Sequence, residues 1–256
     1  MKITKELLKE KGACAAGYRD FLKEYPVDKY PDGVEYQELL DCCAEKDFSY
    51  GSWLLGAFGK TDEVRKIDGD LIVEKGIIFA GRLEVKGCIK AGGGIEAGWG
   101  IDVGGGIEAG NGIKAGNGIK AGLGIKAGNG IKAGLGIKAG YGIDAGWGID
   151  AGNGIKAGNG IKAGLGIKAG YGIEAGWGID AGNGIKAGNG IKAGLGIKAG
   201  WSIKAGGGIE AGDEFGIYAG LHFRITNKTQ RKIIAKNRPE NIMCGEFEEK
   251  KDDAVR

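Results

Sequence analysis

The stretch GNGIKAGNGIKAGLGIKAG, residues 110–128, repeats a six-residue unit, Gly-Ile-Lys-Ala-Gly-X, in which only X changes. Glycine at this density is typical of flexible segments, because each glycine loses extra backbone entropy when it is ordered. Yet every sixth residue from Ile89 to Ile209 is isoleucine, without exception. A disordered chain does not require such a register. The fixed short period therefore predicts a solenoid in which each unit stacks on its neighbours.

The order of residues within the unit predicts which side chains face the core. Ile and Ala lie two positions apart, so they point to one side of an extended strand, and the charged residue between them points to the other. X takes Asn, Leu, Tyr, Trp and Gly, which one close-packed layer cannot hold interchangeably. The chain is therefore expected to turn at Gly-X-Gly, with X outside. The glycines are expected to supply positive-φ corners and a close approach between coils.

The charges indicate how many units make one coil. Three hexads per coil would place residues 18 positions apart in vertical register, about 4.8 Å from each other. One such column alternates perfectly in sign, and it reads Lys90, Glu108, Lys126, Asp144, Lys162, Asp180, Lys198. Opposite charges that face each other across a ladder stabilise it by a few tenths of a kcal/mol, so a triangular coil is favoured over a two-hexad coil.

The length of the stack follows from the phase of the apolar pairs. The same two-residue spacing continues upstream to Leu71 and Val73, and the register breaks after Gly212, where the next pair, Ile217 and Ala219, comes eight residues after Ile209. We interpret this break as the last coil. The prediction is about eight coils and a rod about 38 Å long.

Three regions are predicted. Residues 1–66 form a helical N-terminal domain, residues 67–225 the β-solenoid of hexad repeats, and residues 226–256 a C-terminal cap with a charged tail. Helical spacing predicts helices over 4–25 and 49–59 and a turn followed by a helix within 31–46, and residues 223–237 are typical of a strand. The predicted fold is mainly β, a triangular hexapeptide-repeat β-solenoid of about 18 residues per coil, with both ends covered by non-repeat sequence.

Few residues in the chain are suited to catalysis. His222 is the single histidine, so a three-histidine zinc site of the kind found on some hexapeptide-repeat enzymes cannot be formed. The consensus of hexapeptide-repeat acyltransferases also places the small residue before the aliphatic one. We predict no catalytic residue, cofactor or metal site. The odd number of cysteines without a CxxC pair favours free thiols, and the absence of a signal-peptide core or a long apolar run indicates a cytoplasmic protein.

A partner that meets the repetitive flank of the rod would find many equivalent registers, so specificity requires unique surface. The N-terminal domain is rich in aromatic residues of the types enriched at interfaces. The predicted partner-binding residues are Tyr18, Tyr25, Tyr36 and Trp53. The alternative is that these aromatics only fill a small core, because a domain of this size needs most of its apolar side chains inside.

Lysines outnumber acidic residues among the hexads between Lys90 and Glu210. Lys186, Lys192, Lys198 and Lys204 are candidate polyanion-binding residues, although a solvated charged face is favoured, so nucleic acid is a possible but not favoured partner. Exposed aromatics are also expected at corners, namely Tyr141, Trp147, Tyr171, Trp177 and Trp201. Their block repeats every five hexads, which is not a whole number of three-hexad coils, so they are expected to scatter over the three corners. We interpret the block as a duplicated segment.

The stretches KELLKEKGAC, SYGSWLLGAFG, IDGDLIVEKGIIFAGRLEV and NRPENIMCGEF, together with the GIKAG hexads, resemble a family of uncharacterised bacterial and phage-encoded proteins. That resemblance implies a protein without an assigned activity, located in a bacterial or phage-infected bacterial cell. The stretch IDGDLIV…GRLEVKG is similar to bactofilins, polymer-forming β-helical proteins, which implies end-to-end assembly. The prediction is a non-enzymatic interaction or scaffold protein. The alternatives are a phage or prophage inhibitor that docks on a host or defence protein, and a bactofilin-like self-assembling structural protein.

Overall fold

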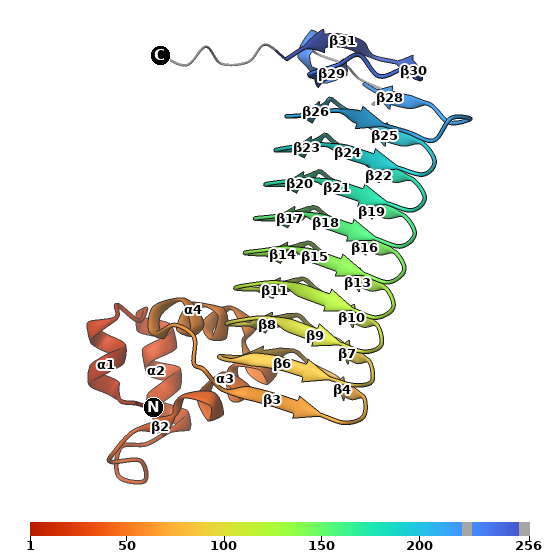
Figure 1. Ribbon diagram of the computed structural model, residues 1–256. Helices are drawn as coiled ribbons and strands as arrows, with labels where there is room; N and C mark the ends of the chain where they lie inside the picture. Colours follow the sequence, from red (N-terminus) through yellow and green to blue (C-terminus); the bar gives the residue numbers. More distant parts are fainter. Residues whose placement is uncertain (222–226, 251–256) are drawn as a thin grey trace.

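The computed structural model describes residues 1–221 and 227–250 of the chain. It is a stack of parallel coils with a helical domain beside the first coils (Figure 1). Each hexad forms one short strand whose Ile and Ala point inward. In the middle of the rod, for example, Ile149 and Ala151 are 1% and 2% exposed. The β-solenoid prediction and the assignment of Ile and Ala to the core are therefore confirmed.

The strands form three parallel sheets, which we call the β3, β4 and β5 faces after the first strand of each. Neighbours within a face are three hexads apart in sequence, as shown by the pairing of Ile107 with Ile89 below and Ile125 above. This register confirms three hexads per coil. It also places the alternating column from Lys90 to Lys198 on the β4 face.

The strand bounds follow the hexads closely. The β3 face contains β3 (Val64–Ile67), β6 (Arg82–Val85), β9 (Ile101–Val103), β12 (Ile119–Ala121), β15 (Ile137–Ala139), β18 (Ile155–Ala157), β21 (Ile173–Ala175), β24 (Ile191–Ala193) and β27 (Ile209–Glu210). The β4 face contains β4 (Leu71–Val73), β7 (Ile89–Ala91), β10 (Ile107–Ala109), β13 (Ile125–Ala127), β16 (Ile143–Ala145), β19 (Ile161–Ala163), β22 (Ile179–Ala181), β25 (Ile197–Ala199), β28 (Ile217–Ala219) and β30 (Ile242–Cys244). The β5 face contains β5 (Ile77–Phe79), β8 (Ile95–Ala97), β11 (Ile113–Ala115), β14 (Ile131–Ala133), β17 (Ile149–Ala151), β20 (Ile167–Ala169), β23 (Ile185–Ala187), β26 (Ile203–Ala205), β29 (Lys232–Ala235) and β31 (Glu246–Glu249).

The stack is longer at both ends than the hexad phase predicts. Strand β3 precedes Leu71 and pairs with β6, so it straddles the predicted boundary at residue 66. The break after Gly212 does not end the rod, because Ile217 of β28 pairs with Ile197 of β25. The extra residues are accommodated in the corner between β27 and β28, outside the core. Sheets of nine, ten and ten strands result, where about eight coils were predicted.

The two glycines of the unit have different roles. A Cβ atom on Gly158, which follows Ala, would lie 1.9 Å from the carbonyl oxygen of Gly140 in the coil below. A Cβ atom on Gly160, which precedes Ile, would lie 3.2 Å from the carbonyl oxygen of Gly178. Ser202 occupies this second, looser position. The predicted close approach of coils is therefore confirmed at the first position.

The prediction that the corners adopt positive φ is wrong. In the described parts of the chain, the residues with positive φ are all outside the hexads, and they are Gly12, Gly33, Gly59, Gly220 and Gly245. The corners of the coil are thus made with negative-φ backbone. Glycine is needed there for space and not for conformation.

The helical domain, which we call the head, contains α1 (Lys5–Glu10), α2 (Ala15–Glu24), α3 (Tyr36–Lys46) and α4 (Phe48–Phe58). A short antiparallel pair, β1 (Lys2–Ile3) and β2 (Val34–Glu35), ties its two halves together. The single helix predicted over 4–25 is two helices, because Gly12 takes a φ of +76° and the Cys14 side chain caps the start of α2. No helix of the described chain has the length and hydropathy needed to cross a bilayer. A 3-10 helix, η1 (Lys228–Arg231), precedes β29.

The head attaches to the side of the first coils and covers one sheet edge. Ile77 N and Phe79 O bond to the neighbouring β8 segment, so Ile78 O and Ala80 N point away from the stack. The Gln37 side chain donates to Ile78 O at 2.7 Å and accepts from Ala80 N at 3.0 Å, in place of a further strand. The head thus covers the β5 edge, and Asp41 of α3 also pairs with Arg65 of β3 at 3.4 Å.

A buried carboxylate makes the second attachment. Glu96, on β8, is 4% exposed and accepts hydrogen bonds from Ser52 of α4 and from Lys114 of the next coil. Ile78 is fully buried in the core of the head. The position of the head on the rod is therefore fixed by hydrogen bonds from Gln37 and Ser52 and by shared apolar packing around Ile78.

Candidate functional site

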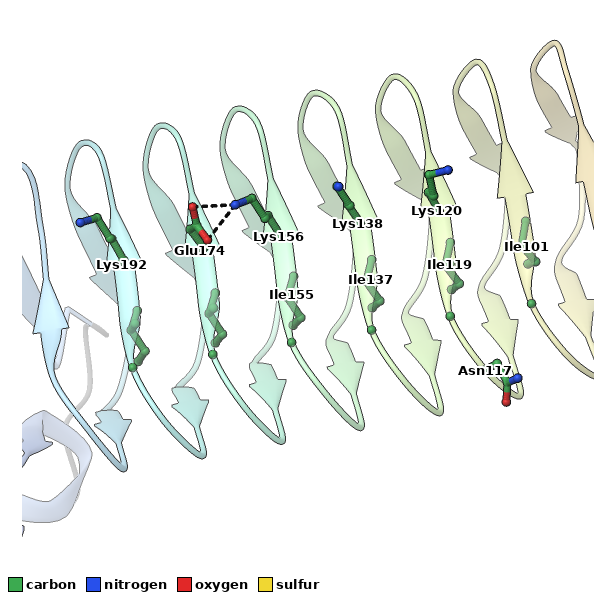
Figure 2. Close-up of a pocket in the computed structure, with 18 of the residues that line it drawn as sticks. Ile101, Asn117, Ile119, Lys120, Ile137, Lys138, Ile155, Lys156, Glu174 and Lys192 are labelled. Carbon is green, nitrogen blue, oxygen red and sulfur yellow. Dashed lines mark hydrogen bonds and ion pairs between the residues drawn. The ribbon is translucent and has the colours of Figure 1, made fainter.

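Each face of the rod carries a groove that runs along the stack. The groove on the β3 face has a volume of about 1330 Å³, and those on the β4 and β5 faces about 1010 and 860 Å³. Each is lined by the glycine before Ile, the Ile and the charged residue of successive coils, as Figure 2 shows for Ile119, Ile137 and Ile155. Because the same groove occurs on all three faces, it follows from the repeat and does not mark a single active site.

Most charges beside the β3 groove are arranged in pairs. Lys156 lies 2.9 Å from Glu174, with its ammonium directed at the carboxylate in Figure 2. Lys192 lies 2.9 Å from Glu210, and this hydrogen bond raises the pKa of Lys192. Such exposed pairs contribute little to stability individually. Their main effect is to neutralise the face.

The four lysines predicted as polyanion ligands do not form one cluster. Lys186 and Lys204 are vertical neighbours on the β5 face. Lys192 lies on the β3 face and Lys198 on the β4 face. Consecutive hexads rotate around the rod, so residues one hexad apart in sequence face different directions.

The corner residues are exposed and scattered, as predicted. Tyr141 and Trp147 are 57% and 58% exposed, and they lie on different corners. The hydrogen bonds that connect successive corners place Trp147 above Asn129, Tyr141 above Leu123 and Tyr171 above Asn153. The aromatics therefore do not stack into one ladder.

The head contains a cleft of about 540 Å³ between its helices. Cys14, Cys42, Cys43, Tyr50 and Trp53 line it, and its rim carries charges of both signs. On this rim Lys46 and Glu24 form an ion pair of 2.6 Å. The cleft is lined by residues of the head alone and therefore lies outside the hexad repeat.

Two of the four aromatics predicted to bind a partner belong to the core. Tyr25 and Tyr36 are 7% and 3% exposed, and burial raises the pKa of both phenols well above the ordinary range. The Tyr36 hydroxyl donates to the carbonyl oxygens of Leu54 and Gly59 at 3.2 and 2.9 Å. These two side chains therefore pack in the core of the head.

Tyr18 and Trp53 remain on the surface. Tyr18 is half-buried with the ammonium of Lys9 over its ring at 5.1 Å, and Trp53 is 36% exposed in the cleft. Tyr50, which was not among the predicted contact residues, lies one helical turn before Trp53 and also lines the cleft. The helical spacing of Tyr50 and Trp53 was the sequence signal for this pair.

The thiols of the head differ in their surroundings. All five cysteines of the chain are free thiols; three lie in the head and two on the rod, namely Cys14, Cys42, Cys43, Cys88 and Cys244. Cys14 is exposed and accepts a hydrogen bond from Gly17 N at 3.3 Å, whereas burial raises the pKa of the Cys43 thiol to about 12. In the described ranges no three His, Cys, Asp or Glu side chains are grouped to hold a metal ion. His222 lies outside the described residues.

We expect Cys43 to resist alkylation near about pH 9, where the raised pKa keeps it protonated, because the thiolate is the reactive form. An unfolded chain ionises this thiol at a lower pH, so stability should fall as the pH rises from about 8.5 towards 12, and Cys43→Ala should reduce that fall. Peptide mapping after iodoacetamide treatment, and urea midpoints measured across this pH range, check both points. Equal alkylation rates at Cys14 and Cys43 would contradict the burial argument.

Comparison of the chain with protein-family models, with curated proteins and with solved structures finds no match. Of the resemblance drawn from the sequence, the structure supports the β-solenoid with three hexads per coil.

Proposed function

We propose that the chain is a non-enzymatic interaction or scaffold protein, in which the head contacts a protein partner and the rod sets the reach of that contact. One observation carries the proposal: a head with its own cleft is locked by Gln37 and Glu96 to one end of a rod of nearly identical coils. A partner would find little on the repeated flank to select one register. Unique surface exists at the two non-repeat ends, and the head is the larger of them.

The core of the rod supports a fixed spacing. One continuous apolar cluster extends from Ile77 to Ala235, and its hexad members are nearly fully buried. Successive coils are also joined on every face by parallel ladders. Ten stacked strands at about 4.8 Å per step give a rod of roughly 43 Å. A structure of this kind has few ways to bend, so it holds its two ends apart.

The cleft supports recognition of a protein surface. Trp53 is exposed at its edge, and Tyr50 lies one turn away on the same helix. Aromatic side chains of this kind provide most of the binding energy at many interfaces. The rim carries Lys23 and Lys46 beside Asp20 and Glu24, which suits a partner with charges of both signs.

The two resemblances suggest two more specific functions. A phage or prophage inhibitor that docks on a host or defence protein, in the cytoplasm of a bacterial cell, would use the same head contact. A self-assembling structural protein would instead use the ends of the rod, where β30 and β31 each have a strand neighbour on one side. The Gln37 amide occupies the β5 edge at the other end, which favours a discrete particle. A mass that rises with concentration in sedimentation would favour assembly.

A photo-crosslinking experiment tests the proposed contact. Benzoylphenylalanine is placed at Trp53, or at the control position Trp177, which is an exposed aromatic on the rod. Irradiation in host cells should give a defined crosslinked species from position 53 and none from position 177. The same species from position 177 alone would contradict the assignment of recognition to the head.

A further inference from the structure

Three successive lysines on the β5 face form a run that begins directly above Asp150. Lys168, Lys186 and Lys204 stand in vertical register on β20, β23 and β26, about 4.8 Å apart. Lys186 therefore has a lysine directly below it and another directly above it. Within residues 1–221 and 227–250, none of the three forms an ion pair within 4.0 Å.

The acidic residues are arranged differently on the other two faces. On the β4 face every lysine from Lys90 to Lys198 has an acidic neighbour in the column, whereas on the β5 face Lys168 has Asp150 below it and Lys186 and Lys204 have no acidic column neighbour. The β3 face also has a run of three lysines, but Lys120 pairs with Asp102 at 3.4 Å and Lys156 with Glu174 at 2.9 Å. Like charges directly opposite in a ladder are destabilising. The β5 run is thus the place where an anion from outside would gain most.

Exposed apolar side chains border this run on both sides. Leu165 and Trp201 lie on the corner before the β5 strands and are 46% and 37% exposed. Tyr171 lies on the corner after them and is 57% exposed. The groove of about 860 Å³ runs between the lysines and extends down to Phe48 and Ser52 of the head. The part of the groove beside Lys168, Lys186 and Lys204 is therefore basic, with Leu165 exposed on one side and Tyr171 on the other.

We propose that the β5 face binds single-stranded nucleic acid, with phosphates along Lys168, Lys186 and Lys204 and a base stacked on Tyr171. A basic groove with a flanking aromatic side chain is the combination that binds single strands without sequence preference. In a duplex the base faces are already stacked, so Tyr171 would have no role. An acidic peptide would use the lysines and leave Tyr171 without a function. The site does not involve the head cleft, so its failure leaves the proposed protein contact unaffected.

Fluorescence anisotropy with a labelled oligothymidylate tests the site on the full chain. The variant Lys168→Gln, Lys186→Gln, Lys204→Gln should bind at least about tenfold more weakly at low salt, and its salt dependence should be less steep. The matched control is Lys120→Gln, Lys138→Gln, Lys156→Gln, which removes the same charge from the β3 face and should bind within about twofold of the parent. Thermal unfolding verifies that both variants are folded.

A second pair of variants tests the stacking. Tyr171 and Tyr141 are both 57% exposed at corners, but only Tyr171 borders the lysine run. Tyr171→Ala should weaken oligothymidylate binding by at least about fivefold, and Tyr141→Ala should not. The proposal is overturned by no binding at low salt, by equal losses in the two lysine variants, or by equal losses in the two tyrosine variants. Displacement of the oligonucleotide by polyglutamate at equal charge concentration would overturn the choice of nucleic acid over an acidic protein segment.

Discussion

Replacement of Gly158 by alanine should unfold or fray the middle of the rod, with a loss of at least about 3 kcal/mol of stability. The new Cβ atom would lie 1.9 Å from the carbonyl oxygen of Gly140, far inside van der Waals contact. Relief requires movement of the backbone, but Gly158 N is bonded to Ala139 O at 3.1 Å in a ladder that continues in both directions. Urea and thermal denaturation followed by circular dichroism measure the effect.

Gly160→Ala is the matched control, on the same corner. Its Cβ atom would lie 3.2 Å from the carbonyl oxygen of Gly178, a tight contact that a small shift relieves. The loss should stay below about 1 kcal/mol, since ordinary surface changes cost little. Cys88, which precedes Ile89 below a regular coil, already shows that the stack accepts a side chain at the equivalent position. Equal losses at Gly158 and Gly160 would show that the two glycines do not differ in role.

Ile149→Asp is the second substitution with a large expected effect. Ile149 is 1% exposed in the centre of the stack and is surrounded by Ile and Ala side chains. The change removes about 2 kcal/mol of side-chain burial and places a carboxylate without a partner in the core, which costs far more. The rod should lose its cooperative transition. Loss of strand signal and increased hydrogen exchange on both sides of β17 are the measurements.

Asn159→Ser supplies the comparison, because Asn159 lies at a corner outside the core. Its effect should be below about 0.5 kcal/mol. If Ile149→Asp and Asn159→Ser shifted the unfolding midpoint equally, the division of the hexad into inner and outer positions would be wrong.

The architecture of the rod was predictable because two independent patterns coincide. The Ile and Ala spacing determines which side chains face inward, and the sign alternation from Lys90 to Lys198 appears only at a step of three hexads. The role of the glycines was not fully predictable. Positive φ and close approach both require glycine, so the residue type alone cannot distinguish them, and the structure selects close approach.

The ends of the rod were harder to predict than its middle. An insertion before Ile217 disturbs the hexad period, but the corner absorbs it, and Ile217 returns to the column of Ile197. Periodicity in the sequence therefore ends before the stack does. In the head, helical spacing continues across Gly12, where the backbone turns and starts a new helix.

The candidate contact residues could also be predicted only in part from the sequence. Residue type indicated Tyr25 and Tyr36 as interface aromatics, but only packing shows that both are buried. The lysine run from Lys168 to Lys204 was visible at a step of three hexads. Grouping by consecutive hexads instead collected Lys186, Lys192 and Lys198, which face three different directions.

The proposal that the head recognises the partner is tested most directly by affinity capture from host-cell extract. Three forms of the chain are compared: the parent, Trp53→Glu, and a deletion of residues 153–170. The deletion removes one whole coil of three hexads, so every face stays in register while the rod becomes shorter by about 4.8 Å. The partner captured by the parent should be retained by the shortened rod and lost by Trp53→Glu, with both variants folded by circular dichroism. A partner that is lost on the coil deletion and retained by Trp53→Glu would place recognition on the rod and contradict the account.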